Sequence, residues 1–225
     1  MQQIFNEVTP PSTNDLVSLA DMKTKLMIAS TDTSKDALLG ELITNMSAVV
    51  ARLCNRVFGY RAVHETFYQL NDQNDAGPAT RRLYLSQWPV VLTDIQSIST
   101  TQDGSGVSTD LLPMADQTWF LEEATGTLYQ RPDQGPWYNT IDVVYSGGYE
   151  LPDDAPPDLV YAVEATIREQ YYVAIRNPNL FGVRQLSHKE SRVAFYPPNM
   201  YSTAGLPQTW STLQMVLSRY ARHWI

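Results

Sequence analysis

The sequence predicts an α+β protein with a small helical bundle built from both ends of the chain, a mostly antiparallel β insertion between the helices, and an extended C-terminal segment. Two separate stretches, residues 36–54 and 156–177, each place their apolar side chains on one helical face. Between them lie short runs of β-branched and aromatic residues separated by turn signals. This order indicates that the two helices pack in one bundle and that the β segment is an insertion between them in the sequence.

The element that organises the prediction is the helix at residues 156–177. At about 100° per residue, its apolar side chains fall in one arc of roughly 120°, as a core-facing helix requires. Pro156 and Pro157 suit a first helical turn, and Asn177 before Pro178 ends the helix. A helix this short is unstable alone, so we expect its arc to pack against residues 36–54.

The remaining elements follow in chain order. Ser18 is expected to cap a first short helix, and Thr33 or Ser34 the helix that follows it. The expected segments are an N-terminal arm at 1–15, the N-terminal helices of the bundle at 16–58, a β-rich insertion at 59–150, the long bundle helix at 151–178, and a C-terminal arm with a terminal helix at 179–225.

The insertion is expected to be a small sandwich or curled sheet of short antiparallel strands. Its Gly-rich stretch, Asp103, Gly104, Ser105 and Gly106, predicts an exposed hairpin tip and a candidate contact with a neighbouring protein. The acidic loop at 71–78 lacks the spacing and the twelfth-position Glu of a calcium loop, so no calcium site is expected there.

Charge is unevenly distributed along the chain. The net charge is -8, but the segment from Arg184 onward has five Lys and Arg against one Glu, a net +4, which leaves -12 on residues 1–183. An acidic body argues against a domain that wraps DNA, and a basic tail suits an acidic partner or nucleic acid. The sequence shows neither a secretory signal nor a run of about 18 apolar residues, so no membrane contact is expected.

The pattern of reactive residues does not favour an enzyme. His64, His188 and His223 have no second histidine or cysteine at ligand spacing, and Cys54 is predicted to be a buried packing residue. There is no Gly-rich phosphate loop, nucleophile elbow or zinc-protease motif. We therefore assign no catalytic, cofactor or metal residue; an enzyme acting through His64 or His188 is the least favoured hypothesis.

Several stretches, taken in order, carry a family resemblance. They are LVSLADMKTKLMI, DALLGELITNMSAVVARLCNRVF, VVYSGGYELPDDAPPDLVYAVEATIREQYY, RVAFYP and GLPQTWSTLQMVLSRYAR. Their order resembles the head–tail connector proteins of tailed bacteriophages, also called adaptor or head completion proteins. The β insertion is longer here than in the simplest members, and the N-terminal arm is an addition.

The resemblance implies a structural protein of the virion, made in the cytoplasm of a bacterial host and located at the head–tail junction. Such proteins form a ring, a dodecamer matching the portal protein, which extends the DNA channel and receives a tail or tail-terminator (nozzle) protein. DNA would pass through this channel without specific binding, as an acidic body permits. The alternative is a tail-associated carbohydrate- or receptor-binding module that uses the tryptophan-rich insertion.

The C-terminal segment is the candidate protein interface. One interpretation is that it packs back on its own bundle as a final helix; the other is that it reaches the portal or a neighbouring subunit, which the resemblance favours. The candidate residues are Arg184, Arg192, Tyr196, Tyr201, Trp210, Leu213, Leu217, Arg219, Arg222 and Trp224.

Overall fold

The computed structural model describes residues 2–68, 81–101, 108–111, 118–131, 137, 140–175, 185–188, 191–194 and 208–221. These residues form an α+β fold, which confirms the predicted class, and every pair of named strands is antiparallel. The chain divides into two compact units. The β unit comprises Met1–Thr13 and Arg56–Leu151, and the helical unit comprises Asn14–Asn55 and Pro152–Ile225.

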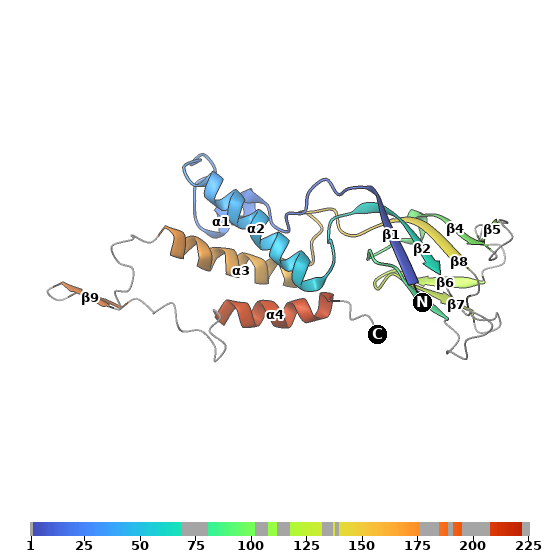
Figure 1. Cartoon of the computed structure of the whole chain (residues 1–225). Coiled ribbons are helices and arrows are strands. Elements are labelled where there is room, and N and C mark those ends of the chain that lie inside the picture. The colour runs from blue at the N-terminus through green and yellow to red at the C-terminus, as the bar shows by residue number, and fades with distance from the viewer. Residues whose placement is uncertain are drawn as a thin grey trace. The chain divides into compact units, whose positions relative to one another are not determined.

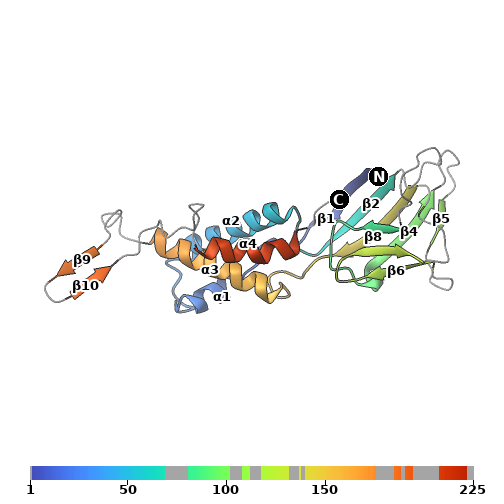
Figure 2. The same ribbon diagram turned by 90° about the horizontal axis from the view of Figure 1, so that it is seen from below.

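The helical unit contains α1 (Leu19–Lys25), α2 (Asp36–Cys54), α3 (Pro157–Ala174) and α4 (Gln208–Tyr220). Helix α3 packs against both α2 and α4, as Figures 1 and 2 show. The side chains that α3 buries include Leu159, Val163 and Ile167, all on the predicted apolar arc. Cys54 is fully buried at the end of α2, as expected.

The two N-terminal helices begin differently. Ser18 caps α1 as predicted, because its Oγ accepts a hydrogen bond from the Asp21 amide at 3.0 Å. Helix α2 instead begins after Lys35 without a side-chain cap. The Ser34 amide donates to Asp32 Oδ1 at 2.9 Å, so the polar residues before α2 stabilise the turn and not the helix end.

The β unit is built from two sheets around one apolar core. Its buried residues come from both sheets and include Phe67, Leu128 and Tyr145. The five-stranded sheet has the order β1 (Gln2–Thr9), β2 (Arg61–Tyr68), β8 (Thr140–Gly147), β4 (Ile95–Thr101) and β5 (Ser108–Asp110). The three-stranded sheet has the order β3 (Arg82–Tyr84), β7 (Thr127–Gln130) and β6 (Trp119–Glu122), and the short helix η1 (Leu92–Asp94) precedes β4.

The first residues differ from the loose arm expected at 1–15, because they form strand β1 on the edge of the large sheet. Gln3 Nε2 donates to Glu65 Oε2 at 2.9 Å, and Glu7 Oε2 lies 2.6 Å from Arg61 Nη1. The Arg61 guanidinium also lies over the Phe5 ring. The polar residues that suggested a solvated arm therefore have specific partners on β2, about sixty residues away in the chain.

The two ends of the insertion are joined by backbone hydrogen bonds. The Tyr60 amide donates to the Tyr149 carbonyl at 2.8 Å, and the Tyr149 amide donates to the Phe58 carbonyl at 2.9 Å. Gly148 has φ +111°, and a Cβ there would lie 2.7 Å from the Gly59 carbonyl oxygen. Glycine is required at this position, since it allows the close approach of the two chain segments.

A buried carboxylate lies on β2, the strand that pairs with β1. Glu65 is fully buried, and its carboxylate accepts hydrogen bonds from the Ser86 amide at 3.0 Å, the Tyr145 hydroxyl at 2.9 Å and Gln3. Burial raises the pKa of Glu65 above its usual value of 4.5, although these hydrogen bonds oppose the shift. The folded state therefore binds the Glu65 proton more tightly than the unfolded chain does.

We predict that the β unit becomes less stable as the pH rises, because buried Glu65 loses its proton. Between the ordinary pKa of Glu65 and its raised value, the folded protein must lose a proton that it holds tightly, so the free energy of unfolding falls. Glu65→Gln has no such proton. In urea titrations followed by tryptophan fluorescence, the stability of this variant relative to wild type should rise from about pH 4 to about pH 7. A difference that stays constant over this range would contradict the prediction.

Candidate functional site

The two leucines among the candidate interface residues lie in the core of the helical unit. Leu213 and Leu217 are 0% and 4% exposed on α4, which packs against α2 and α3. The Cys54 thiol also lies 3.8 Å from the Leu217 carbonyl oxygen. In the described part of the C-terminal segment, the chain thus packs back as a final helix, and these two side chains are unavailable to a partner in this conformation.

Arg219 and its neighbour tie the end of α4 to the start of α3. Arg219 Nη1 lies 3.5 Å from Asp158 Oδ2, and the Tyr220 hydroxyl donates to Asp158 Oδ1. The Arg219–Asp158 ion pair is exposed, so it contributes little to stability. Its guanidinium already has a partner within the same chain.

The other candidates cannot be placed as side chains. Arg192 belongs to strand β10 (Ser191–Ala194) and Trp210 to α4, but the structure describes only the backbone at these positions. The candidates that lie outside the described residues are Arg184, Tyr196, Tyr201, Arg222, Trp224 and the insertion tip of Asp103, Gly104, Ser105 and Gly106. The acidic loop considered for calcium, at 71–78, lies outside them as well.

A surface that the sequence analysis did not single out lies on the outer side of α3. Tyr161 and Tyr172 are 65% and 54% exposed, and Arg168 is exposed between them. Together with Ala165, they recur at the spacing of one helical stripe; we call these four residues the α3 tyrosine face. Tyrosine and arginine are enriched in protein interfaces relative to the rest of the surface. The signal was present in the sequence as tyrosines outside the apolar arc.

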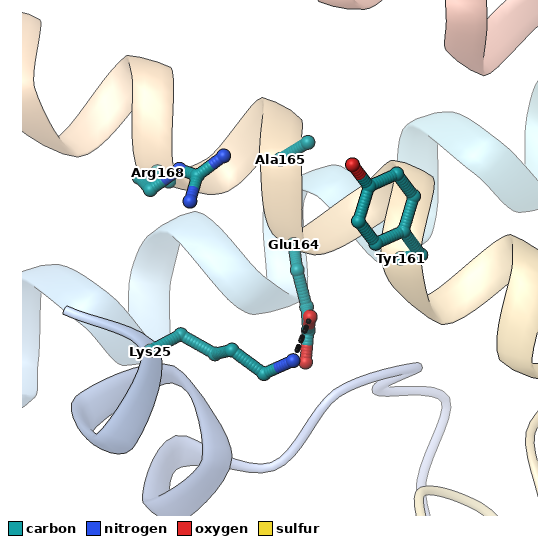
Figure 3. A pocket seen from close by; sticks show the side chains of 5 residues that line it. All are labelled: Lys25, Tyr161, Glu164, Ala165 and Arg168. Carbon is teal, nitrogen blue, oxygen red and sulfur yellow. Dashed lines mark ion pairs between the residues drawn. The ribbon is translucent and has the colours of Figure 1, made fainter.

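A small hollow adjoins this face. It has a volume of about 70 Å³ and is lined by Lys25, Glu164 and three members of the α3 tyrosine face (Figure 3). Lys25 Nζ lies 3.1 Å from Glu164 Oε2, so an ion pair between two of the lining residues joins α1 to α3. Ligand pockets for small molecules are several times larger, of the order of 300 Å³ or more. The hollow therefore has the size for a side chain of a protein partner.

His64 lies beside a carboxylate, but not in the order of a nucleophile–base–acid triad. His64 Nε2 is 3.2 Å from Asp142 Oδ1, and the Thr66 hydroxyl donates to the same oxygen at 2.6 Å. In a nucleophile–base–acid triad the imidazole lies between the hydroxyl and the carboxylate. Here the carboxylate lies between the other two groups, so His64 cannot activate Thr66. His188 lies on strand β9 (Gln185–His188), and its side chain is not described.

Among the described residues, no group of three or more His, Cys, Asp or Glu side chains is placed to hold a metal ion. Two tryptophans of the insertion, Trp119 and Trp137, are 1% and 2% exposed and belong to the core of the β unit. These two indole rings cannot form a platform for stacking sugars. Helix α2 is long and apolar enough to cross a membrane by length and composition, but its buried side chains pack within the helical unit.

The net charge belongs to one of the two units. The β unit carries thirteen Asp and Glu against five Lys and Arg, a net -8. The helical unit carries eleven of each and is neutral overall. Its balance arises because the basic C-terminal segment offsets the acidic residues of its helices. An anionic partner such as DNA would thus be repelled by the β unit.

No protein-family model matches the chain. No curated protein matches its sequence either.

Solved structures do share its fold. A chain from the neck of an empty gene transfer agent (GTA) particle, computed with C6 symmetry, matches with a TM-score of 0.54 at 13% identity. A chain from the virion of the native GTA particle matches with a TM-score of 0.53 at 15% identity, and one from the native neck, computed with C12 symmetry, with 0.50 at 14%. Each match covers 99% of this chain and 97% of the other. The whole chain, including both units, therefore has a fold that also occurs in the neck of a phage-like particle.

Proposed function

We propose that the chain is a structural subunit of the neck of a phage-like particle, where it forms a ring between the portal and the tail. The observation that carries this proposal is the extent of the fold match, which covers 99% of this chain and 97% of the neck chain. Both units of the chain are included in this match. The order of sequence motifs, which resembles the connector proteins, supports the same assignment independently.

The ring is proposed from symmetry and from surface chemistry. The matching GTA necks were computed with C6 and C12 symmetry, and a ring of twelve copies would match a dodecameric portal. A ring subunit needs surfaces on which other neck subunits can pack. The α3 tyrosine face has the composition of such a surface, and its arginine and tyrosines are the residue types that dominate binding energy at interfaces.

The charge of the β unit suits the passage of DNA. A net charge of -8 disfavours phosphate contacts, so DNA could slide past this unit without being held. We assign portal contact to the last residues of the chain, which follow α4 and include Arg222 and Trp224. The ring would also bind a tail or tail-terminator protein. The burial of Trp119 and Trp137 disfavours the alternative of a carbohydrate-binding tail module.

The direct test is to remove the gene from a cell that produces the particle. We expect heads that fill with DNA but remain tailless, because the ring that joins the portal to the tail is missing. Electron microscopy of the particles measures this, and supply of the wild-type chain from a plasmid should restore tails. Complete particles in the absence of the chain would contradict the proposed function.

The α3 tyrosine face gives a second prediction. Tyr161→Ser with Tyr172→Ser should leave the melting temperature of the isolated chain unchanged, because both rings are exposed. Incorporation of the chain into necks should fall sharply, since interface tyrosines can each contribute about 2 kcal/mol or more to binding. Met215→Ser, at a position 61% exposed on α4, is the control. Equal incorporation of the tyrosine variant and this control would remove the face from the interface.

Two truncations separate the role of α4 in the core from the role of the residues after it. Ending the chain before Leu206 removes Leu213 and Leu217 from the core, and each buried leucine contributes roughly 1.5–3 kcal/mol, so the helical unit should unfold. Ending it after Ala221 removes Arg222 and Trp224 but leaves α4 complete. This shorter truncation should keep its circular dichroism melt and lose binding to purified portal rings. Portal binding equal to that of the full chain would show that these last residues are not the anchor.

A further inference from the structure

The outer edge of β1 is an open strand edge. β1 pairs with β2 on one side, and among the described strands none lies on its other side. Ile4, Phe5 and Val8 are 41%, 38% and 59% exposed along it. Edge strands are commonly protected by lysine, proline, shortness or a bulge. β1 has eight residues and has neither Lys nor Pro; its register with β2 is regular from Gln2 to Glu7 and shifts only at its end, between Glu7 and Thr9.

A second incomplete element lies between α3 and α4. The strands β9 (Gln185–His188) and β10 (Ser191–Ala194) pair only with each other and form a two-stranded sheet, visible in Figure 2. An isolated two-stranded hairpin is at best marginally stable in water, and a third strand is needed for independent stability. Within the described part of the chain, no further strand joins this sheet.

We infer that the β9–β10 hairpin of one copy adds to the free edge of β1 in a second copy. The inference rests on the proposed function, because the ring is what brings a second copy alongside. Strand addition would give the hairpin its missing neighbour and supply hydrogen-bond partners for the open backbone groups of β1. It would also cover the exposed apolar side chains of that edge.

The charges of the two elements are complementary. Residues 184–194 contain Arg184, Lys189 and Arg192 against Glu190, a net +2, whereas the β unit that carries β1 has a net -8. Opposite charge favours the encounter and disfavours pairing of two β1 edges with each other. The lengths are also compatible, since a four-residue strand spans about 13 Å and an eight-residue strand about 26 Å.

The two elements are different surfaces of the same chain, so the contact is head-to-tail. Each copy would donate its hairpin to one neighbour and receive a hairpin from the other. Head-to-tail contacts of this kind close into rings when the rotation between copies allows it. The inference thus names both halves of the contact between adjacent ring subunits.

Complementation of two damaged chains tests the contact. Ile4→Lys with Val8→Lys blocks the β1 edge, and replacing residues 185–194 by a Gly-Ser linker of equal length removes the hairpin. We expect wild type to form large oligomers in native mass spectrometry and each damaged chain to stay monomeric. Their equal mixture should give dimers that do not grow, because only one intact half-contact of each kind remains. Met27→Lys with Met215→Lys adds the same charge at exposed positions of the helical unit and should assemble like wild type.

Cross-linking provides a measurement that does not depend on either damaged chain. One otherwise wild-type chain carries Asn6→Cys, and a second one, with a mass tag, carries Ser187→Cys. Cys54 is buried and should not react. A short bismaleimide should join the two chains only in the assembled ring.

The outcomes separate this inference from the proposed function. If each damaged chain forms rings by itself, or if rings form without the cross-link, the inference is overturned and the proposed function stands. A mixture that stays monomeric also overturns the inference, as would occur if the hairpin folded onto β1 of its own copy. A wild-type chain that forms no ring, alone or on isolated portal rings, overturns both.

Discussion

The packing of α3 between α2 and α4 is the interaction on which the rest of the structure depends. Helix α2 ends at Cys54 and α3 begins at Pro157. Helix α3 is stable only when α2 and α4 both cover its apolar arc. The roughly one hundred residues between Cys54 and Pro157 must therefore leave the helical unit and return to it at adjacent points. The hydrogen bonds between Tyr60 and Tyr149 and between Phe58 and Tyr149 meet that requirement, and they let the β unit form a core of its own.

Helical periodicity carried most of the fold prediction. The apolar arcs identified α2, α3 and α4, and strand-forming residues between turn signals identified the β insertion, because both signals are local in sequence. β1 was missed for the opposite reason. Its polar residues, among them Gln3 and Glu7, resemble a solvated arm until Glu65 and Arg61 are identified as their partners. A strand whose partners lie about sixty residues away has no local signature that distinguishes it from an arm.

The candidate interface was only partly predictable. Leu213 and Leu217 form an apolar stripe that looks the same whether it faces the chain's own core or a partner, and only packing on α2 and α3 decides between them. The α3 tyrosine face was obscured because tyrosine is common both in cores and on interfaces; Tyr171 is buried whereas Tyr172, beside it, is 54% exposed. The buried state of Glu65 likewise depends on residues from three separate strands and loops, and no spacing in the sequence encodes it.

The division of the helical unit between the two ends of the chain also fixes the order in which a newly made subunit can fold. The β unit is complete once Leu151 has been synthesised, so it can form while the ribosome is still at work. Helix α2 is synthesised much earlier, and its apolar side cannot pack against α3 and α4 until first α3 and then α4, which ends at Tyr220, have been made. The last helix to emerge is thus the one that closes the bundle. Any contact that requires a finished helical unit is withheld from every chain whose synthesis is incomplete.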